Sequence, residues 1–199
     1  MKMSKHEKKM RKSVKKTAKL LGRRGLTSGM RSSVSQRLES GHFQMTPRGV
    51  YLRNMKKKMV VTLDATGNPV YHRYGWQPND DLPLHLAVYQ ARGDVNGIIH
   101  AHPPYLAALG LAVDALDYDR LPAELQTLGR ALVVDQIDVQ TGDVPTNLLN
   151  ALTNGNVVLL PGNGVLVAGR SLDHAYAQLD EMEHHAQVFE IAKSVGLIA

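Results

Sequence analysis

Two histidines one residue apart, His100 and His102, have the types and spacing best suited to chemistry in this sequence. His100 lies in the apolar run Val95–Ala101 and His102 directly follows it, before Pro103 and Pro104. The run predicts a buried strand, and residues two apart on a strand share a face, so both imidazoles could hold one metal ion. Pairs of hydrogen-bonded core histidines show the same spacing. A metal site would also need at least a third protein ligand.

A third ligand must come from residues distant in sequence, and thiolates are excluded because there is no cysteine. His184 and His185 are adjacent on a predicted helix, where neighbours diverge by about 100°, so at most one can face a given site. His85 has the position of a packed core histidine. The full set of candidates is His85, His184, His185, Asp81 and Asn163.

Hydrophobic periodicity predicts the elements that position these residues. A stripe at Met10, Val14, Ala18 and Leu21 predicts a helix over 6–21. Helices and short strands mix throughout, which favours one α/β or α+β domain over 1–199, with residues 1–7 flexible. Further helices are predicted at about 80–91, 104–111, 145–153 and from 171, and strands at 43–46, 59–63, 95–101, 132–134, 156–160 and 165–168.

Charge is distributed unevenly. Residues 1–58 carry a net +16 and residues 59–199 a net −10, which gives +6 for the chain. A basic helix can bind nucleic acid, but base-reading or stacking residues do not accompany it, so we favour a basic face that meets acidic parts of this chain or of a neighbouring subunit. No apolar run approaches the roughly 20 residues of a membrane span, so we expect no membrane binding. We also expect a cytoplasmic protein that does not bind nucleic acid.

Six ordered segments make the chain resemble the class II aldolase/adducin family over about residues 10–195. The resemblance implies a three-layer α/β/α sandwich around a mostly antiparallel sheet, assembled as a homotetramer. The segments are Gly25-Leu26, Ser32–Arg37, Thr46–Val50, Pro78–Tyr89 with its Asn79-Asp80-Asp81, His100–Pro104, and Gly162–Gly169 followed by the last helix.

The resemblance implies that three histidines hold a divalent metal, as in the family's aldolases. A glutamate serves separately to transfer protons. His100 and His102 match the first two ligands, Asn163 stands in place of the third, and Asp81 stands in place of the glutamate. Zn²⁺ is the expected metal, with Mn²⁺ or Mg²⁺ as alternatives because an amide oxygen ligates less strongly than imidazole. The alternative is a site that no longer binds metal.

Substrate-binding positions depart from the family's pattern too. The resemblance places them at Ser33, Thr46, Arg48, Gly49, Asn79 and Asp80. An aspartate would repel a phosphate, whereas the fork of Arg48 suits a carboxylate. The sequence therefore predicts a metal-dependent lyase, either aldolase or decarboxylase, that acts on a small unphosphorylated hydroxy or carbonyl compound. A non-catalytic adducin-like binding module is the alternative.

Overall fold

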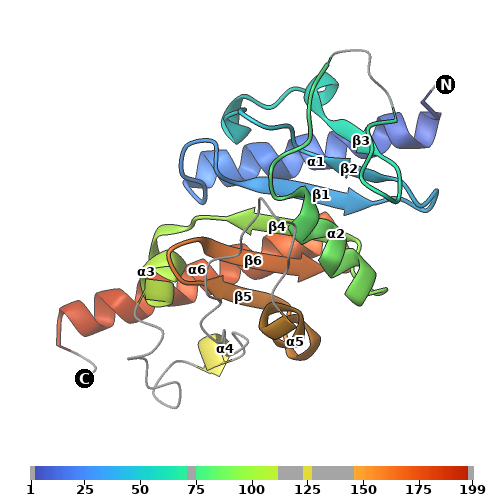
Figure 1. Ribbon diagram of the computed structural model, residues 1–199. Helices are drawn as coiled ribbons and strands as arrows, with labels where there is room; N and C mark the ends of the chain where they lie inside the picture. Colours follow the sequence, from blue (N-terminus) through green and yellow to red (C-terminus); the bar gives the residue numbers. More distant parts are fainter. Residues whose placement is uncertain (1–2, 71–74, 112–122, 127–145, 197–199) are drawn as a thin grey trace.

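The computed structural model describes residues 3–70, 75–111, 123–126 and 146–196 (Figure 1). Among these residues a six-stranded sheet has the order β3-β2-β1-β4-β6-β5, and each neighbouring pair is antiparallel. The predicted strand at 132–134 lies outside the described residues. The strands are β1 (Ser33–Arg37), β2 (Phe43–Met45), β3 (Val61–Leu63), β4 (Gly97–Ala101), β5 (Val157–Leu160) and β6 (Gly164–Gly169).

Helices cover both faces of this sheet. Figure 1 shows α1 (Lys5–Arg24) and α6 (Leu172–Ser194) on one face, and α2 (Leu82–Ala91) and α5 (Thr146–Asn154) on the other. The expected α/β/α sandwich around an antiparallel sheet is confirmed. Shorter elements complete the described fold: α3 (Pro104–Leu111), which packs on α6, β5 and β6, then α4 (Ala123–Gln126) and the 3₁₀ turns η1 (Leu52–Asn54) and η2 (Lys57–Met59).

The first helix starts earlier than the sequence predicted. Ser4 accepts a hydrogen bond from the backbone N–H of Glu7, while the Glu7 side chain accepts from the N–H of Ser4, which forms a capping box. The helix therefore begins at Lys5, one residue before the predicted start and within the stretch 1–7 that was expected to be flexible. The stripe predicted for this helix is confirmed on its inner side, where Val14, Ala18 and Leu21 are fully buried.

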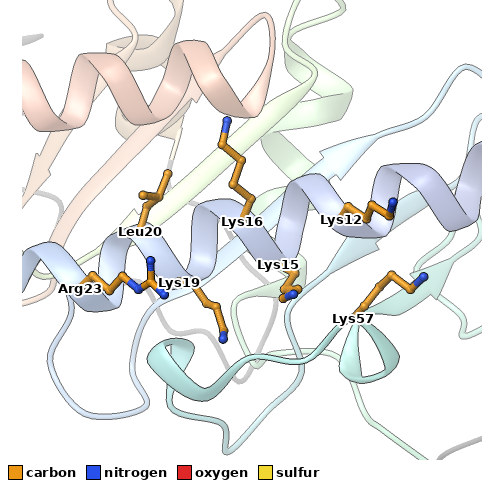
Figure 2. Close-up of a pocket in the computed structure, with 7 residues that line it drawn as sticks. All are labelled: Lys12, Lys15, Lys16, Lys19, Leu20, Arg23 and Lys57. Atoms are coloured by element: carbon orange, nitrogen blue, oxygen red, sulfur yellow. The ribbon is translucent and has the colours of Figure 1, made fainter.

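The basic face of α1 is partly neutralised within the chain. Lys16 forms an ion pair with Asp173 at 3.0 Å and Arg24 with Asp180 at 2.8 Å. Helix α1 thus meets acidic residues of α6, as expected if its basic face packs against acidic parts of the same chain. Helix α1 and η2 also border a groove of about 490 Å³ (Figure 2). Its lining is Lys12, Lys15, Lys16, Lys19, Leu20, Arg23 and Lys57.

Strand β1 was not predicted from the sequence, because its residues Ser-Val-Ser-Gln-Arg contain a single apolar side chain. In the fold both faces of β1 are covered. Ser33 and Ser35 point toward α2, where they hydrogen-bond to side chains of that helix, whereas Gln36 donates to the carbonyl of Met10 in α1. Polar partners on both sides thus replace the apolar pattern of a central strand.

Strands β4, β5 and β6 form the apolar centre of the fold. Ile98, Ile99 and Val167 are fully buried, which agrees with the apolar runs predicted at 95–101 and 165–168. Of the helices that the structure describes, none has the length and apolar character of a membrane span.

Gly97, at the start of β4, allows α6 to approach the sheet. A Cβ atom here would lie 2.5 Å from the backbone nitrogen of Leu172 and 2.6 Å from the carbonyl carbon of Ser171. Both contacts are closer than packed atoms permit, and neither backbone atom can rotate away. The first turn of α6 is thereby fixed against the strand that carries His100.

Gly97→Ala should lower the free energy of unfolding by about 2–3 kcal/mol, because the helix must move off the strand. Gly93→Ala is the matched control, since nothing lies within 4 Å of a Cβ at that position. Its effect should stay within about 0.5 kcal/mol. Urea denaturation followed by circular dichroism measures both, and equal stabilities of the two variants would contradict this packing.

Candidate active site

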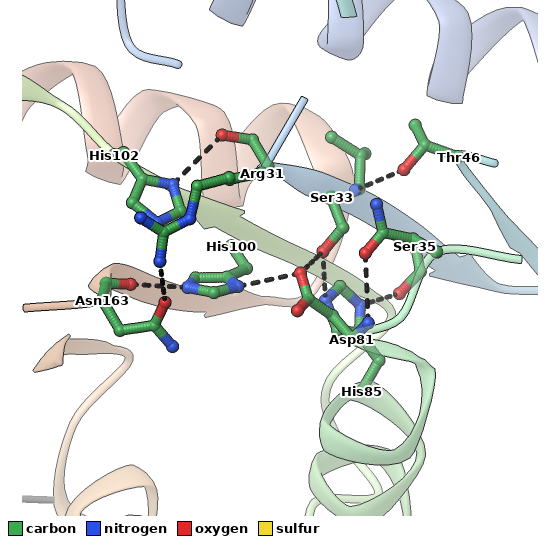
Figure 3. Close-up of polar contacts among 12 residues, drawn as sticks. Arg31, Ser33, Ser35, Thr46, Asp81, His85, His100, His102 and Asn163 are labelled. Carbon is green, nitrogen blue, oxygen red and sulfur yellow. Dashed lines mark hydrogen bonds and ion pairs between the residues drawn. The ribbon is translucent and has the colours of Figure 1, made fainter. Parts of the chain in front are cut away.

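The candidate site begins with a cross-strand pair. Ser33 of β1 is directly opposite His100 of β4, so both side chains point to the face covered by α2. Asp81, at the N-terminus of α2, lies between them: the Ser33 hydroxyl donates to Asp81 Oδ2 at 2.6 Å, and His100 Nδ1 lies 2.9 Å from the same oxygen (Figure 3). A buried carboxylate thus joins two strands and a helix.

His85 is a packed histidine of α2 that extends this network. Its Nε2 lies 2.9 Å from the Ser33 hydroxyl and its Nδ1 lies 2.7 Å from the Ser35 hydroxyl. The Ser35 hydroxyl also lies 2.9 Å from the hydroxyl of Tyr89. Both ring nitrogens of His85 have partners inside the fold, which agrees with the expectation of a core histidine.

Asn163 lies beside His100 through its backbone. The Asn163 carbonyl oxygen is 2.7 Å from His100 Nε2, in the turn between β5 and β6 (Figure 3). This turn is held against β4 by Gly164, which has φ +79°, and where a Cβ would lie 2.1 Å from the Ala101 carbonyl oxygen. Only glycine permits both this backbone conformation and this approach.

His102 is next to this turn and to the loop that precedes β1. Its Nδ1 lies 3.4 Å from the Ser32 hydroxyl, and its Nε2 is buried without a hydrogen-bond partner among the described residues. Arg31, an exposed residue of the same loop, points its guanidinium at the site and lies 3.4 Å from Asn163 Oδ1 (Figure 3). The site therefore opens on the side of Arg31, His102 and Asn163.

The remaining positions expected to bind substrate are mostly engaged with the protein itself. The Thr46 hydroxyl accepts from the N–H of Val34, and the Asn79 side chain accepts from the N–H of Asp81. Arg48 and Asp80 form an exposed ion pair with each other. These residues hold the loops around the site, and the Arg48 fork already has a carboxylate partner.

Gly49 is the last of the expected substrate-binding positions. It is exposed, and its φ of +70° with no atom within 4 Å of a Cβ identifies a turn residue. The structure therefore brings together Ser33, Asp81, His100, His102 and Asn163, and leaves Gly49 and the Arg48–Asp80 pair at the surface.

Comparison with known proteins shows the family of the chain. Residues 12–189 match the model of the class II aldolase and adducin N-terminal domain. The chain belongs to the class II aldolase and adducin family. A match of this extent includes every residue of the candidate site, from Arg31 to Asn163.

Relatives of this family member include decarboxylases and aldolases. A 3-oxo-tetronate 4-phosphate decarboxylase of Haemophilus influenzae is 29% identical over 171 residues, covering 83% of this chain and 80% of the relative. A 3,4-dihydroxyphthalate decarboxylase of Arthrobacter keyseri is 27% identical over 179 residues, covering 84% and 72%. The solved structure of an L-fuculose 1-phosphate aldolase superposes with a TM-score of 0.76 at 26% identity, covering 98% and 89%.

The protonation of His100 bears on whether this member of the class II aldolase family can hold a metal as expected. Burial lowers the pKa of His100, but the charge and hydrogen bond of Asp81 and the Asn163 carbonyl outweigh burial and raise it. Both ring nitrogens face oxygen acceptors, so both carry hydrogen and the ring is an imidazolium. In this arrangement a metal at Nε2 would have to displace both the ring hydrogen and the contact with the Asn163 carbonyl.

Nearby charge also disfavours a divalent ion. Arg31 brings a guanidinium to the residues that the resemblance assigned to metal binding, and the amide oxygen of Asn163 faces that guanidinium. Within the described part of the chain, no cluster of three or more His, Cys, Asp or Glu is arranged to hold a metal. For His100, His102 and Asn163 to hold Zn²⁺, Mn²⁺ or Mg²⁺ as expected, the contact of His100 with the Asn163 carbonyl and that of Arg31 with the Asn163 side chain would have to open.

Asp81, the expected proton-transfer residue, is held in its charged form by its neighbours. Burial opposes ionisation of Asp81, yet His100 and the Ser33 hydroxyl hold the pKa of this carboxyl well below its usual range. A carboxylate this acidic is a poor proton acceptor near neutral pH. The pair therefore carries its proton on His100, and Asp81 orients the ring.

Two residues with a part in the site were missed by sequence reasoning. Arg31 lies in an irregular loop, where no periodicity indicates direction. Glu183 accepts from the backbone N–H groups of Tyr105 and Leu106, and so caps the start of α3 directly after the His102 segment. The available signal for Glu183 was its spacing of four from Leu179 and three from Ala186, which places an acid on the apolar stripe of the last helix.

His85 should make stability depend on pH. Burial lowers its pKa to about 4, from an ordinary value of 6.5. Between these values the unfolded chain binds a proton that the folded chain does not, so the free energy of unfolding rises with pH from about 4 to 6.5. The contribution of His85 is at most about 1.4 kcal/mol per pH unit.

His85→Gln should reduce the slope of stability against pH in this window by the contribution of one proton. His184→Gln is the control, since His184 is exposed, and it should leave the slope unchanged. Urea titrations at intervals from pH 4 to 7 provide the measurement. An unaltered slope in the His85 variant would show that His85 does not remain neutral in the folded protein.

Proposed function

We propose that this protein is a carbon–carbon lyase, of aldolase or decarboxylase type, acting on a small unphosphorylated hydroxy or carbonyl compound. The observation that supports it best is the buried Asp81–His100 ion pair, which lies beside the neutral His102 at the C-terminal end of β4. The relatives described above are aldolases and decarboxylases, and one of them is a decarboxylase whose name includes no phosphate.

Both reactions give an enolate-like intermediate. In aldol cleavage solvent water takes the hydroxyl proton, the C–C bond breaks, and its electron pair forms an enolate whose negative charge lies on the former carbonyl oxygen. In decarboxylation the bond to the carboxylate breaks, CO₂ leaves, and the same oxygen becomes negative. A neutral imidazole such as His102, with a ring nitrogen lacking a protein partner, can donate a hydrogen bond to that oxygen.

His100 supplies the proton that completes either reaction. Its Nε2–H now bonds to the Asn163 carbonyl, so the Asn163 turn must yield when substrate enters. Asp81 keeps the imidazolium in place through Nδ1 and stabilises its charge. After the proton moves to the enolate carbon, the neutral ring is reprotonated from solvent.

An unphosphorylated substrate is favoured because the residues that the resemblance assigned to substrate binding already have partners in the protein. Ser33 and Asn79 use their polar atoms within the protein, and the Asp80 carboxylate is directed at Arg48. These residues would have to break existing contacts to bind a phosphate, and Asp80 would repel it.

A panel of hydroxy acids, keto acids and aldol donors tests the activity, with EDTA or with added Zn²⁺, Mn²⁺ or Mg²⁺. We expect C–C cleavage of at least one compound, and His100→Gln should lower kcat by about 10²-fold because a positioned acid is lost. His6→Gln, an exposed change on α1, should leave kcat unchanged. No cleavage under any condition would favour the non-catalytic binding module.

We further propose that the protein is a homotetramer. Val188, Ile191 and Val195 follow one another at helical spacing near the end of α6, and they are 50%, 50% and 63% exposed. An apolar stripe of this kind is typical of a surface that another subunit covers.

Sedimentation velocity should show a species of four chains, and Ile191→Lys should shift it toward smaller species because the stripe gains a charge. Lys193→Glu, an exposed charge change on the same turn, controls for altered net charge. A wild-type monomer would contradict the assembly.

A further inference from the structure

The basic groove between α1 and η2 contains cations that the fold does not neutralise. Lys16, which lines the groove, and Arg24 pair with acidic residues of α6. The other lining cations form no ion pair within the described part of the chain: Lys12, Lys15, Lys19, Arg23 and Lys57. Contacts between α1 and α6 therefore account for only part of the positive charge on this helix.

This arrangement of cations is unfavourable for the helix itself. Lys15, Lys19 and Arg23 follow one another at intervals of four residues, and Lys12 lies three residues before Lys15. Side chains at these spacings are neighbours on a helix, and like charges there destabilise it. Residues 8–24 of α1 include no acid that could offset the repulsion. A bound anion would relieve it, so anion binding should stabilise the fold.

Close packing fixes both walls of the groove without a ligand. Gly22 allows η1 to approach α1, since a Cβ atom there would lie 2.7 Å from the backbone nitrogen of Arg53. Met55 and Val60, which flank η2, are buried in the core. Lys57 is thereby held beside α1, and Figure 2 shows lysines of α1 extending toward the segment that carries it. A preformed site loses less conformational freedom on binding than a flexible charged surface does.

The size and charge of the groove fit a short chain of phosphates. Its volume of about 490 Å³ lies in the range of small-molecule sites, roughly 300–1,000 Å³. Its cations require a compact ligand with several negative charges, and each lysine can donate three hydrogen bonds to phosphate oxygens. A single phosphate or carboxylate would leave most of these cations without a partner.

Larger polyanions fit the groove less well. Among the described residues that line it, none is an aromatic side chain on which a nucleic-acid base could stack. Leu20 is the single apolar residue of this lining and is half-buried, whereas a membrane-binding helix exposes a row of large apolar side chains. An acidic peptide would find no main-chain partner on α1, because helical backbone groups bond to one another.

We propose that the groove between α1 and η2 is a binding site for a short polyphosphate chain, held by Lys12, Lys15, Lys19, Arg23 and Lys57. Free inorganic polyphosphate and the triphosphate of a nucleotide share this chemistry. Helix α1 lies on the opposite face of the sheet from α2, which covers the candidate active site (Figure 1). The polyphosphate site is therefore separate from that site and independent of the proposed function.

Isothermal titration calorimetry of the full chain in EDTA, with inorganic tripolyphosphate as the ligand, tests this site. We expect one tripolyphosphate per chain, an affinity that falls as added salt screens the charges, and about tenfold or weaker binding of orthophosphate. Tripolyphosphate should also raise the thermal unfolding midpoint. Tighter binding of ATP than of tripolyphosphate would assign the site to a nucleotide, and the reverse order would assign it to free polyphosphate.

Two adjacent lysines of η2 give a matched comparison. Both are exposed, but Lys57 lines the groove and Lys58 does not. Lys57→Gln should weaken the Kd for tripolyphosphate about threefold or more, whereas Lys58→Gln should leave it unchanged. Lys15→Gln combined with Lys19→Gln should weaken the Kd about tenfold or more. This double variant should keep the circular dichroism spectrum of the wild type, because it removes repulsion on α1.

Several results would overturn the polyphosphate site. Absence of tripolyphosphate binding at low salt is the first. Equal effects of Lys57→Gln and Lys58→Gln would show attraction to the overall charge of this surface instead of binding in the groove. Tighter binding of a short DNA oligonucleotide than of tripolyphosphate would assign the groove to nucleic acid. Loss of tripolyphosphate binding in Ser33→Ala would place the phosphates in the candidate active site.

Discussion

The ion pair between Asp81 and His100 is the interaction on which the site depends. It joins the N-terminus of α2 to β4, and the Ser33 hydroxyl ties β1 to the same oxygen. Taking two charges out of water is costly, and removing either partner would leave the other buried and uncompensated. The three elements are thus held in one arrangement, and the polar network specifies that arrangement more narrowly than apolar packing alone would.

Electrostatics explains why neighbouring histidines have different states. The pKa of His100 is raised because its two ring nitrogens face the Asp81 carboxylate and the Asn163 carbonyl. The pKa values of His85 and His102 are lowered because burial and nearby positive charge oppose protonation. One short strand end therefore presents a proton donor next to a neutral ring. Sites that transfer protons commonly contain chemically similar groups whose surroundings give them different pKa values.

Sequence reasoning could find the parts of the site that lie on regular elements. The apolar run into His100 predicts a strand, two β-runs predict a turn at Asn163, and the family resemblance implies that this turn lies beside His100. It could not find β1, because Ser33 and Ser35 are buried through hydrogen bonds with His85 that exist only in the folded chain. It also could not find Arg31 beside the site or the ion pair of Arg48 with Asp80, because the direction of an irregular loop and a contact between side chains depend on tertiary structure.

The contact between His100 and Asn163 uses the backbone carbonyl, which every amino acid supplies. Substitution at position 163 can therefore leave the turn and the imidazolium in place, provided that Gly164 is retained, while it changes what the side chain offers to the pocket. Such a position can diverge during evolution at little cost to folding. A scaffold with this property can exchange one ligand chemistry for another by a single codon change.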